Sequence, residues 1–548
     1  MTTTSGPAPR PLSAAGSPAE RLRRYDWRFL LPAPADGSFG RIVIVGRPAG
    51  VAEDLVRLGV AREATVTPPD APTADAVVAL RGARVRPEEA RAWLREGGVL
   101  LLEVDRRAPG RLAATPARVR KALARAGFET LGCWWAKPDL ERCGMYLPLE
   151  SDGALEWYHR RHHAPRSTAA RALARAIGWV TGWKAARFAR WVPTFVVVAR
   201  AGAARDGGVG VLGGRGVPTS LLPPRSRPLL LLGGEGAWSR VVVLPFGAGA
   251  DRPVVVVKHP RLARYNAATR RERTTLKRIR ARVGGPLRAS LPMPVAAGRW
   301  RGLSVAAERC VAGRSVYAAC ASGGEREAGV SLRLAASWLA AFHVRTVVAR
   351  PPLDALRIER LLARPVARYT AALGCEGAER ALFDEARARA ERVAGTTLPI
   401  VWQHRDFGPW NVHRDGRRIA VIDWEVARPG PALCDLLYFT LHWSWLVRGH
   451  RAGSDRRRDF EALFLDPGRG GAPAAACRRA IARYMERLEI APALAPLLLL
   501  HLLLEQALDR VRRLRAVGAR AARDDNPYVG YLGVLAGRPD RLFEREWP

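Results

Sequence analysis

The chain of 548 residues is longer than one hydrophobic core usually serves, and 48% of it is apolar, so two or three domains are expected. It carries 89 basic and 51 acidic residues, but the arginines are spread along the whole chain and only five of the basic residues are lysines. Because no RNA- or DNA-binding motif accompanies it, this charge indicates an arginine-rich composition, argues against a nucleic-acid partner, and favours neutral or anionic ligands over polycationic ones.

The compartment is indicated by the cysteines and by the apolar runs. Seven scattered cysteines without metal-ligand spacing are typical of a reducing compartment. Residues 1–24 are rich in Thr, Ser, Ala, Pro and Arg without an apolar core, so residues 1–35 are assigned to a disordered leader and not to a signal peptide. The longest apolar run, residues 494–504, is too short to span a bilayer and indicates a buried helix. The sequence therefore predicts a cytoplasmic protein with no membrane span.

Residues 36–205 alternate strand signals with helix signals. The expected elements, in chain order, are strands 41–45 and 76–80, helix 87–94, strand 99–104, helix 118–126 and strand 194–199. Such alternation predicts a mostly parallel α/β sheet.

Parts of this segment resemble a class I methyltransferase: the turn and strand at residues 94–100, the crossing at 126–128 and the last strand at 191–200. The resemblance implies a Rossmann-like domain. Its cofactor loop reads Gly-Arg-Pro-Ala-Gly at residues 46–50 in place of a Gly-x-Gly type, and only Asp70 is placed to hold a ribose. Three interpretations stay open: a degenerate domain kept for structure or assembly, an S-adenosylmethionine-dependent methyltransferase, or another α/β domain.

A linker is expected at residues 206–226, which are dense in Gly, Pro and Arg. Beyond it, two apolar strands flank a Gly-rich turn at residues 233–239, and a valine strand ends in Lys258. A helix at 270–279 follows, and then a strand at 303–307 that leads into Glu308.

Lys258 is a candidate phosphate ligand, because a compact ammonium was retained in a chain that otherwise uses arginine. Glu272 is the only acid among residues 258–306 and is therefore the single candidate partner for Lys258. The alternatives are a solvated lysine at a strand end and a Gly-rich turn that is only a hairpin.

The strongest motif is His-Arg-Asp-Phe-Gly-Pro-Trp-Asn at residues 404–411, followed by an apolar run that ends in Asp423. Phosphoryl transfer depends on positioning and on electrostatic stabilisation, so it needs a carboxylate for the nucleophile and oxygen ligands for Mg²⁺. Asp406, Asn411 and Asp423 supply this set on one loop and on the strand that returns beside it. The alternative is a polar surface turn.

Residues 404–423 resemble the catalytic and metal loops of the aminoglycoside phosphotransferase and choline kinase superfamily. The resemblance implies a two-lobed protein-kinase-like fold, with an N-lobe at residues 227–312 and a helical C-lobe at 313–548. The whole chain is then multidomain α/β plus α+β, with the Rossmann-like domain first. Trp424-Glu425 follows Asp423 in place of Phe-Gly, which argues against a protein kinase.

The resemblance also implies roles for individual residues. Asp406 is the catalytic base, Asn411 and Asp423 bind Mg²⁺, His404 braces the loop and Asp435 anchors it. The residues implied in nucleotide binding are Lys258, Glu272, Gly234, Gly236 and Ser239, with the backbone of Glu308 and Cys310 reading adenine.

The sequence thus predicts an ATP- and Mg²⁺-dependent phosphotransferase that acts on a hydroxyl of a sugar, polyol or amino alcohol. The acceptor pocket is expected among the helices after Ile358, and Glu425, Glu505 and Asp509 do not cluster as a cationic aminoglycoside would require. The alternatives are a pseudokinase-type nucleotide-binding scaffold, a bifunctional methyltransferase–kinase in glycan or natural-product modification, and a nucleic-acid binder supported by charge alone.

Overall fold

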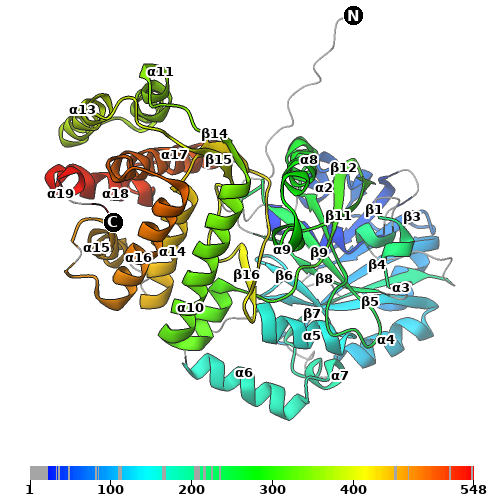
Figure 1. The fold of residues 1–548 in the computed structure, drawn as a ribbon. Coiled ribbons are helices and arrows are strands. Elements are labelled where there is room, and N and C mark those ends of the chain that lie inside the picture. The colour runs from blue at the N-terminus through cyan, green and yellow to red at the C-terminus, as the bar shows by residue number, and fades with distance from the viewer. Residues whose placement is uncertain are drawn as a thin grey trace, which may run out of the picture. The chain divides into compact units, whose positions relative to one another are not determined.

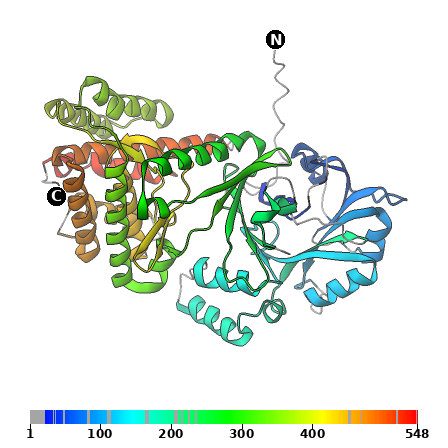
Figure 2. The ribbon, with the colours of Figure 1, turned by 45° about the vertical axis from the view of Figure 1, so that its right-hand side comes forward.

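The computed structural model describes residues 22–32, 34, 37–46, 50–80, 83, 85–108, 114–162, 168–202, 210–213, 217–223, 226–233, 236–449, 453–466, 468–516, 520–544 and 547. The chain forms two compact units, which are described separately. Unit 1 comprises Met1–Arg160, Ala169–Arg270 and Pro294–Cys310, and unit 2 comprises Arg161–Thr168, Arg271–Met293 and Val311–Pro548. Figure 1 labels their elements and Figure 2 gives a second view.

Unit 1 is built on one twelve-stranded sheet in the order β11-β12-β10-β9-β8-β6-β5-β7-β4-β3-β1-β2. Its strands are β1 (Phe39–Val45), β2 (Ala61–Thr65), β3 (Ala74–Ala79), β4 (Leu94–Asp105), β5 (Phe128–Lys137), β6 (Met145–Pro148), β7 (Thr194–Ala201), β8 (Arg227–Leu231), β9 (Arg240–Phe246), β10 (Val255–Pro260), β11 (Pro294–Trp300) and β12 (Leu303–Arg309).

The predicted parallel arrangement holds for β1 to β4, which pair in parallel. Strand β7 then runs antiparallel to both β4 and β5. The helices of this part are α2 (Val51–Arg57), α3 (Pro87–Trp93), α4 (Pro116–Arg125), α5 (Asp152–Trp157), α6 (Thr168–Thr181) and α7 (Ala185–Phe188). Helix α4 begins where the Thr115 side chain accepts the Arg118 N–H and a proline occupies the first turn.

The sheet does not stop at the predicted linker. Met145 pairs with Leu231 and Tyr146 with Leu230, so β6 joins β8 in antiparallel register. Two short 3-10 helices, η3 (Gly210–Gly213) and η4 (Thr219–Leu221), lie within the predicted linker. The boundary that composition suggested between residues 205 and 227 is therefore not a boundary of the structure, because two apolar strand edges pair across it.

The segment from residue 22 to residue 32 is buried, although the sequence assigned it to the leader. It contains the 3-10 helix η1 (Asp26–Phe29), in which Asp26 and Trp27 are completely inaccessible. Asp26 forms ion pairs with Arg28 at 3.1 Å and with Arg261 at 3.0 Å. The leader assignment was wrong for these residues, because their partner Arg261 lies 235 positions away and leaves no local pattern.

Unit 2 is predominantly helical, as the sequence predicts. Its helices are α9 (Gly285–Ala289), α10 (Val316–Arg345), α11 (Ala355–Ile358), η6 (Glu359–Ala363), α12 (Arg364–Leu373), α13 (Gly377–Arg392), α14 (Cys434–Arg448), α15 (Gly453–Phe464), α16 (Gly471–Leu488), η7 (Pro492–Leu494), α17 (Ala495–Arg515), α18 (Pro527–Ala536) and α19 (Pro539–Phe543). Two three-stranded sheets accompany them: β13 (Arg314–Ser315), β16 (Val412–Asp415) and β17 (Arg418–Val421); and β14 (Val347–Ala349), β15 (Ile400–Gln403) and β18 (Arg428–Pro431). Helix α8 (Asn266–Arg282) crosses from one unit to the other.

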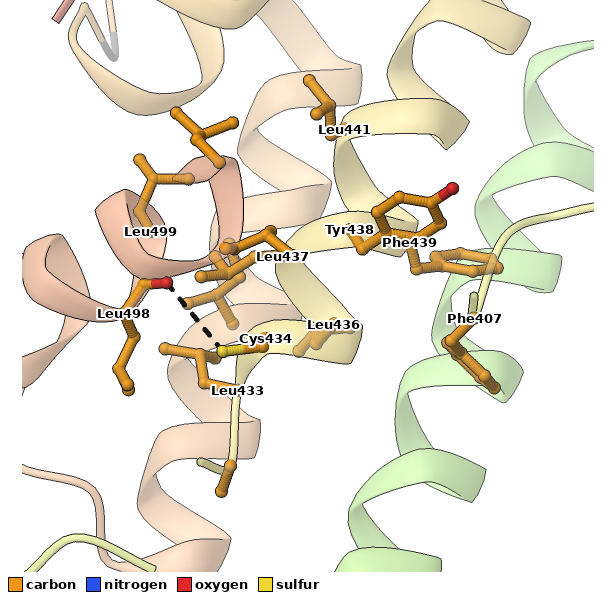
Figure 3. Packing of buried hydrophobic residues seen from close by; sticks show 14 of the residues in the cluster. Phe407, Leu433, Cys434, Leu436, Leu437, Tyr438, Phe439, Leu441, Leu498 and Leu499 are labelled. Atoms are coloured by element: carbon orange, nitrogen blue, oxygen red, sulfur yellow. Dashed lines mark hydrogen bonds between the residues drawn. The ribbon is translucent and has the colours of Figure 1, made fainter. Parts of the chain in front are cut away.

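The core of unit 2 packs α14 against α17 (Figure 3). Leucines of α14 face Leu498 and Leu499, and the Cys434 thiol donates to the Leu498 carbonyl. Among the residues described, one stretch, Pro492–Arg515, is long and apolar enough to cross a membrane by length and composition, and 67% of its apolar window is buried inside the protein. This burial is typical of a core helix.

Candidate active site

The residues of the predicted catalytic motif lie together in unit 2. Strand β15 leads into the loop at 404–411, and the β16–β17 hairpin then carries the chain to Asp423. The Asn411 side-chain amide donates to the Asp406 carbonyl at 2.9 Å and to Asp406 Oδ2 at 3.0 Å. Because this NH₂ group is engaged, the Asn411 oxygen is the atom suited to a cation. Asp423 has a left-handed φ of 70°, a strained conformation of the kind that clusters at functional sites.

Both oxygens of the Asp406 carboxylate are held. The Tyr438 hydroxyl donates to Oδ1 at 3.1 Å, while Asn411 occupies Oδ2. Removal from water raises the pKa of Asp406 above its ordinary value, and the negative charge of Asp423 raises it further. The two carboxylates therefore repel each other, and a cation placed with them would relieve the repulsion.

His404 ties this loop to the segment that carries Asp423. The imidazole is fully buried, and its Nε2 lies 2.8 Å from the carbonyl oxygen of Ile422. The Asp406 N–H points to Nδ1 at 3.3 Å, so Nδ1 accepts and Nε2–H donates. One ring thus fixes the loop relative to the residue directly before Asp423.

Asp435 anchors the same loop from the first turn of α14. Its carboxylate accepts the backbone N–H groups of His404 at 2.6 Å and Arg405 at 2.8 Å, and it lies 3.5 Å from His343 Nε2. Burial alone would raise the pKa of Asp435, but the hydrogen bond and the charge interaction with His343 and those with His404 lower it.

Two residues at this site were not assigned to the catalytic loop from the sequence, although Glu505 was considered among the acids of the acceptor side. Tyr438 follows Asp435 by three positions on α14, so helical spacing places both side chains on one face and was a usable signal. Glu505 comes from α17 and forms an ion pair with Arg405 at 2.9 Å. Nothing near Arg405 in the sequence indicates this partner, which lies 100 positions away.

The predicted nucleotide ligand Lys258 lies in unit 1, where its Nζ is 2.5 Å from Glu308 Oε1. Strand β10 pairs with β12 so that Lys258 lies opposite Ala306, which places Glu308 diagonally across on the same face. Glu272 was therefore not the single candidate partner. Glu272 belongs to unit 2, where it is buried and accepts the Trp424 N–H at 3.2 Å.

The Gly-rich turn lies between the paired strands β8 and β9, and its role over the phosphates stays a prediction. The Ser239 N–H donates to the Gly236 carbonyl at 3.0 Å, and Arg261 donates to the same carbonyl at 3.0 Å. A Cβ at Gly236 would meet the Trp238 ring at 2.2 Å, so a larger residue at this position would displace that side chain. Gly234 lies outside the described residues.

Of the two residues predicted to read adenine, Glu308 carries the side chain that pairs with Lys258. The Cys310 N–H donates to the Val254 carbonyl at 3.0 Å. Because this donor is used within unit 1, a role for Cys310 in reading adenine is restricted to its carbonyl.

The donor set of the loop suits a hard divalent cation. Asp423 and Asn411 offer oxygen atoms, and Mg²⁺ is usually held by one or two carboxylates together with water and substrate phosphates. Within the part of the chain that the structure describes, no group of three or more His, Cys, Asp and Glu residues could form a self-sufficient metal site. A cation here would thus take the rest of its ligands from water and from the substrate.

Comparison with known proteins places this motif in a family. The phosphotransferase enzyme family matches residues 245–475, a range that begins within β9 and contains Lys258 and the loop at 404–423. A search of curated proteins gave no match.

Several solved structures resemble the chain. They include a glucosamine kinase (18% identity, 54% of this chain, 76% of that chain, TM-score 0.34) and an amicoumacin kinase in complex with AMP-PNP and Ca²⁺ (12%, 60%, 92%, 0.36). A third is a choline/ethanolamine kinase family protein from Mesorhizobium loti (15%, 58%, 88%, 0.33). At TM-scores this low the likenesses carry no argument of their own, and none of these proteins bears on the methyltransferase resemblance. Residues 245–475 of this chain form a domain of the phosphotransferase enzyme family, with the kinase-like fold predicted for the C-terminal half.

Proposed function

We propose that this protein is a small-molecule kinase that transfers the γ-phosphoryl group of ATP to a hydroxyl of a sugar, polyol or amino alcohol. The observation that carries the proposal is the arrangement of Asp406, Asn411 and Asp423 within a phosphotransferase-family domain. The Asn411 side chain donates a hydrogen bond to Asp406, and the negative charge of Asp423 raises the pKa of Asp406.

Each residue has a defined task in this reaction. Asp406, held at both oxygens, orients the acceptor hydroxyl and takes its proton as the phosphoryl group is transferred. Asn411 and Asp423 would hold Mg²⁺, which supplies positive charge against the phosphates. Lys258, kept extended on β10 by Glu308, would neutralise the α- and β-phosphates.

A pseudokinase-type scaffold is the competing function. It would retain the fold and bind nucleotide without transfer, and such proteins usually lack part of the catalytic set. This chain has the complete set of Lys258, Asp406, Asn411 and Asp423. The bifunctional alternative adds S-adenosylmethionine binding by residues 36–205, and calorimetry with that cofactor on the full chain tests it separately.

The proposal predicts metal-dependent nucleotide binding that Asp423→Ala removes. Calorimetry should show that the wild-type protein binds ATP with Mg²⁺ and that the variant binds it more than about tenfold more weakly, since a direct metal ligand is lost. Asp415→Ala is the matched control, because it removes an exposed carboxylate from the same hairpin. Equal affinity in wild type and Asp423→Ala would exclude the metal role of Asp423, and a folded wild type that binds no ATP would refute the proposal.

A further inference from the structure

A cavity of about 560 Å³ in unit 2 is lined by an unusual number of arginines. They are Arg357, Arg360, Arg364, Arg368, Arg405 and Arg428. The first four recur at intervals of three or four residues along α11, η6 and α12, and therefore form one stripe on a helical surface. Like charges at this spacing destabilise a helix, so the stability of the helix does not account for the presence of these arginines.

The acids present do not balance this charge. Among the residues that the structure describes, only Asp435 and Glu505 line the cavity with carboxylates, and Asp435 already accepts hydrogen bonds from the backbone of the loop. Glu505 alone faces three guanidinium groups, those of Arg405 at 2.9 Å, Arg428 at 3.0 Å and Arg368 at 3.7 Å.

The other arginines of the cavity differ in their pairing. Arg357 and Arg364 pair with Asp354 and Glu359 at the protein surface. For Arg360, no ion pair is found with any residue that the structure describes. Burial lowers the pKa of Arg428, and the positive charge of Arg405 lowers it further. An anion in the cavity would relieve this repulsion.

The cavity lies against the residues that hold the catalytic loop. Tyr438 lines the cavity and donates its hydroxyl to Asp406. Arg405 directly precedes Asp406, and Gln506, another lining residue, donates to the Arg405 carbonyl at 3.3 Å. Tyr438 is thus in contact with both the cavity and Asp406.

We propose that this cavity binds a phosphate group carried by the acceptor, so that the substrate is a phosphorylated sugar or polyol with a free hydroxyl. The inference rests on the proposed kinase function. Guanidinium groups match the geometry of phosphate oxygens with paired hydrogen bonds, and several converge here. The cavity volume lies within the range of small-molecule sites, which leaves room for a sugar phosphate.

The first experiment measures binding of inorganic pyrophosphate by calorimetry in metal-free buffer at fixed ionic strength. The triple variant R360A/R364A/R368A should bind at least about tenfold more weakly than wild type. The control R380A/R387A/R392A removes the same charge from the exposed surface of α13 and should bind like wild type. Lys258→Ala should also bind like wild type. Three results would overturn the cavity assignment. They are an equal loss of pyrophosphate affinity in both triple variants, a loss of pyrophosphate binding in Lys258→Ala, and no pyrophosphate binding by the wild-type protein.

The second experiment tests the acceptor role and separates it from the kinase proposal. MgATP binding should be the same in wild type and R360A/R364A/R368A; if neither binds MgATP while pyrophosphate still binds, the kinase function fails and the anion site stands. ADP release is then measured with sugars and polyols in phosphorylated and unphosphorylated forms. Turnover should require the phosphorylated form, with KM raised and kcat retained in the triple variant. Equal turnover of unphosphorylated acceptors would refute the substrate class.

Discussion

At the scale of single residues, the feature that dominates the site is a hydrogen bond to each oxygen of the Asp406 carboxylate. A carboxylate with both oxygens held cannot rotate, so its orientation toward a hydroxyl is fixed before the substrate arrives. The sequence identified Asp406, Asn411 and Asp423 because they lie within 18 positions and their chemistry is specific. Tyr438 and Glu505 belong to later helices, and only the fold brings them to the loop.

Tyr438→Phe should shift the pH dependence of activity. Removal from water and the charge of Asp423 raise the pKa of Asp406, whereas the Tyr438 hydrogen bond lowers it by stabilising the carboxylate. Without that bond the pKa of Asp406 should rise, so the ascending limb of kcat/KM against pH should move to higher pH. Turnover of wild type and variant from pH 4 to 8 measures this. An unchanged limb would show that Asp406 is not the group whose ionisation limits the rate.

Asp435→Asn should destabilise unit 2 in a pH-dependent way. The folded-state pKa of Asp435 is lowered, so its carboxylate contributes stability that is fully present above the unfolded value of about 3.9 and is lost as pH falls through the folded pKa. Losing the charged acceptor should cost about 2–3 kcal/mol at pH 7. Urea unfolding should show this difference at pH 7 and a smaller one below pH 4. Asp415→Asn, at an exposed site, should leave stability unchanged; a difference for Asp435→Asn that is the same at both pH values would contradict the ionic role.

At the scale of elements, the Gly-rich hairpin is held by Arg261, which in turn pairs with the N-terminal segment. Arg261 donates to the carbonyl of Leu232, directly after β8, and to that of Gly236 within the turn, and Asp26 supplies its counter-charge. The hairpin itself was predictable, because two apolar strands flank glycines. Its anchor was not, because pairing between distant buried charges has no period in the sequence.

Asp26→Asn should lower the stability of unit 1 and loosen the Gly-rich hairpin that Arg261 holds. The change leaves Arg28 and Arg261 buried without a carboxylate, and breaking a buried ion pair in this way costs about 3–5 kcal/mol. Burial already lowers the pKa of Arg28 to about 10, which shows how little water reaches it. The midpoint of thermal unfolding and the affinity for ATP should both fall. Glu63→Gln, which breaks an exposed ion pair with Arg41, should change neither quantity. A variant as stable as wild type would show that the network contributes nothing.

At the scale of the whole molecule, the strands of the predicted N-lobe belong to the same sheet as the N-terminal segment. Alternation of strands and helices was enough to predict the parallel strands β1, β3 and β4, whereas β2 was not predicted. The pairing of β6 with β8 was not predictable. It joins segments about 85 positions apart, and the apolar pattern of neither segment indicates the other as its partner. Composition marked a linker where the structure has continuity.

A chain truncated to residues 227–548 should therefore fail to behave as an independent kinase domain. It would lack β6 and the segment that carries Asp26, and it would expose the β8 edge with Leu229 and Leu230, a template for aggregation. Size-exclusion chromatography should show aggregates for this chain and a defined species for residues 22–548. A well-folded 227–548 that binds ATP would show that the continuous sheet is dispensable.

The junction of β6 and β8 also has a mechanical consequence. Only two residue pairs are in register there, against seven between β5 and β7 and five between β8 and β9. Hydrogen bonds of a sheet run across the strands, so a pull in that direction meets its lowest resistance at this junction. Under tension the sheet would separate first between β6 and β8. Single-molecule stretching of unit 1 would record this separation as the event with the lowest rupture force.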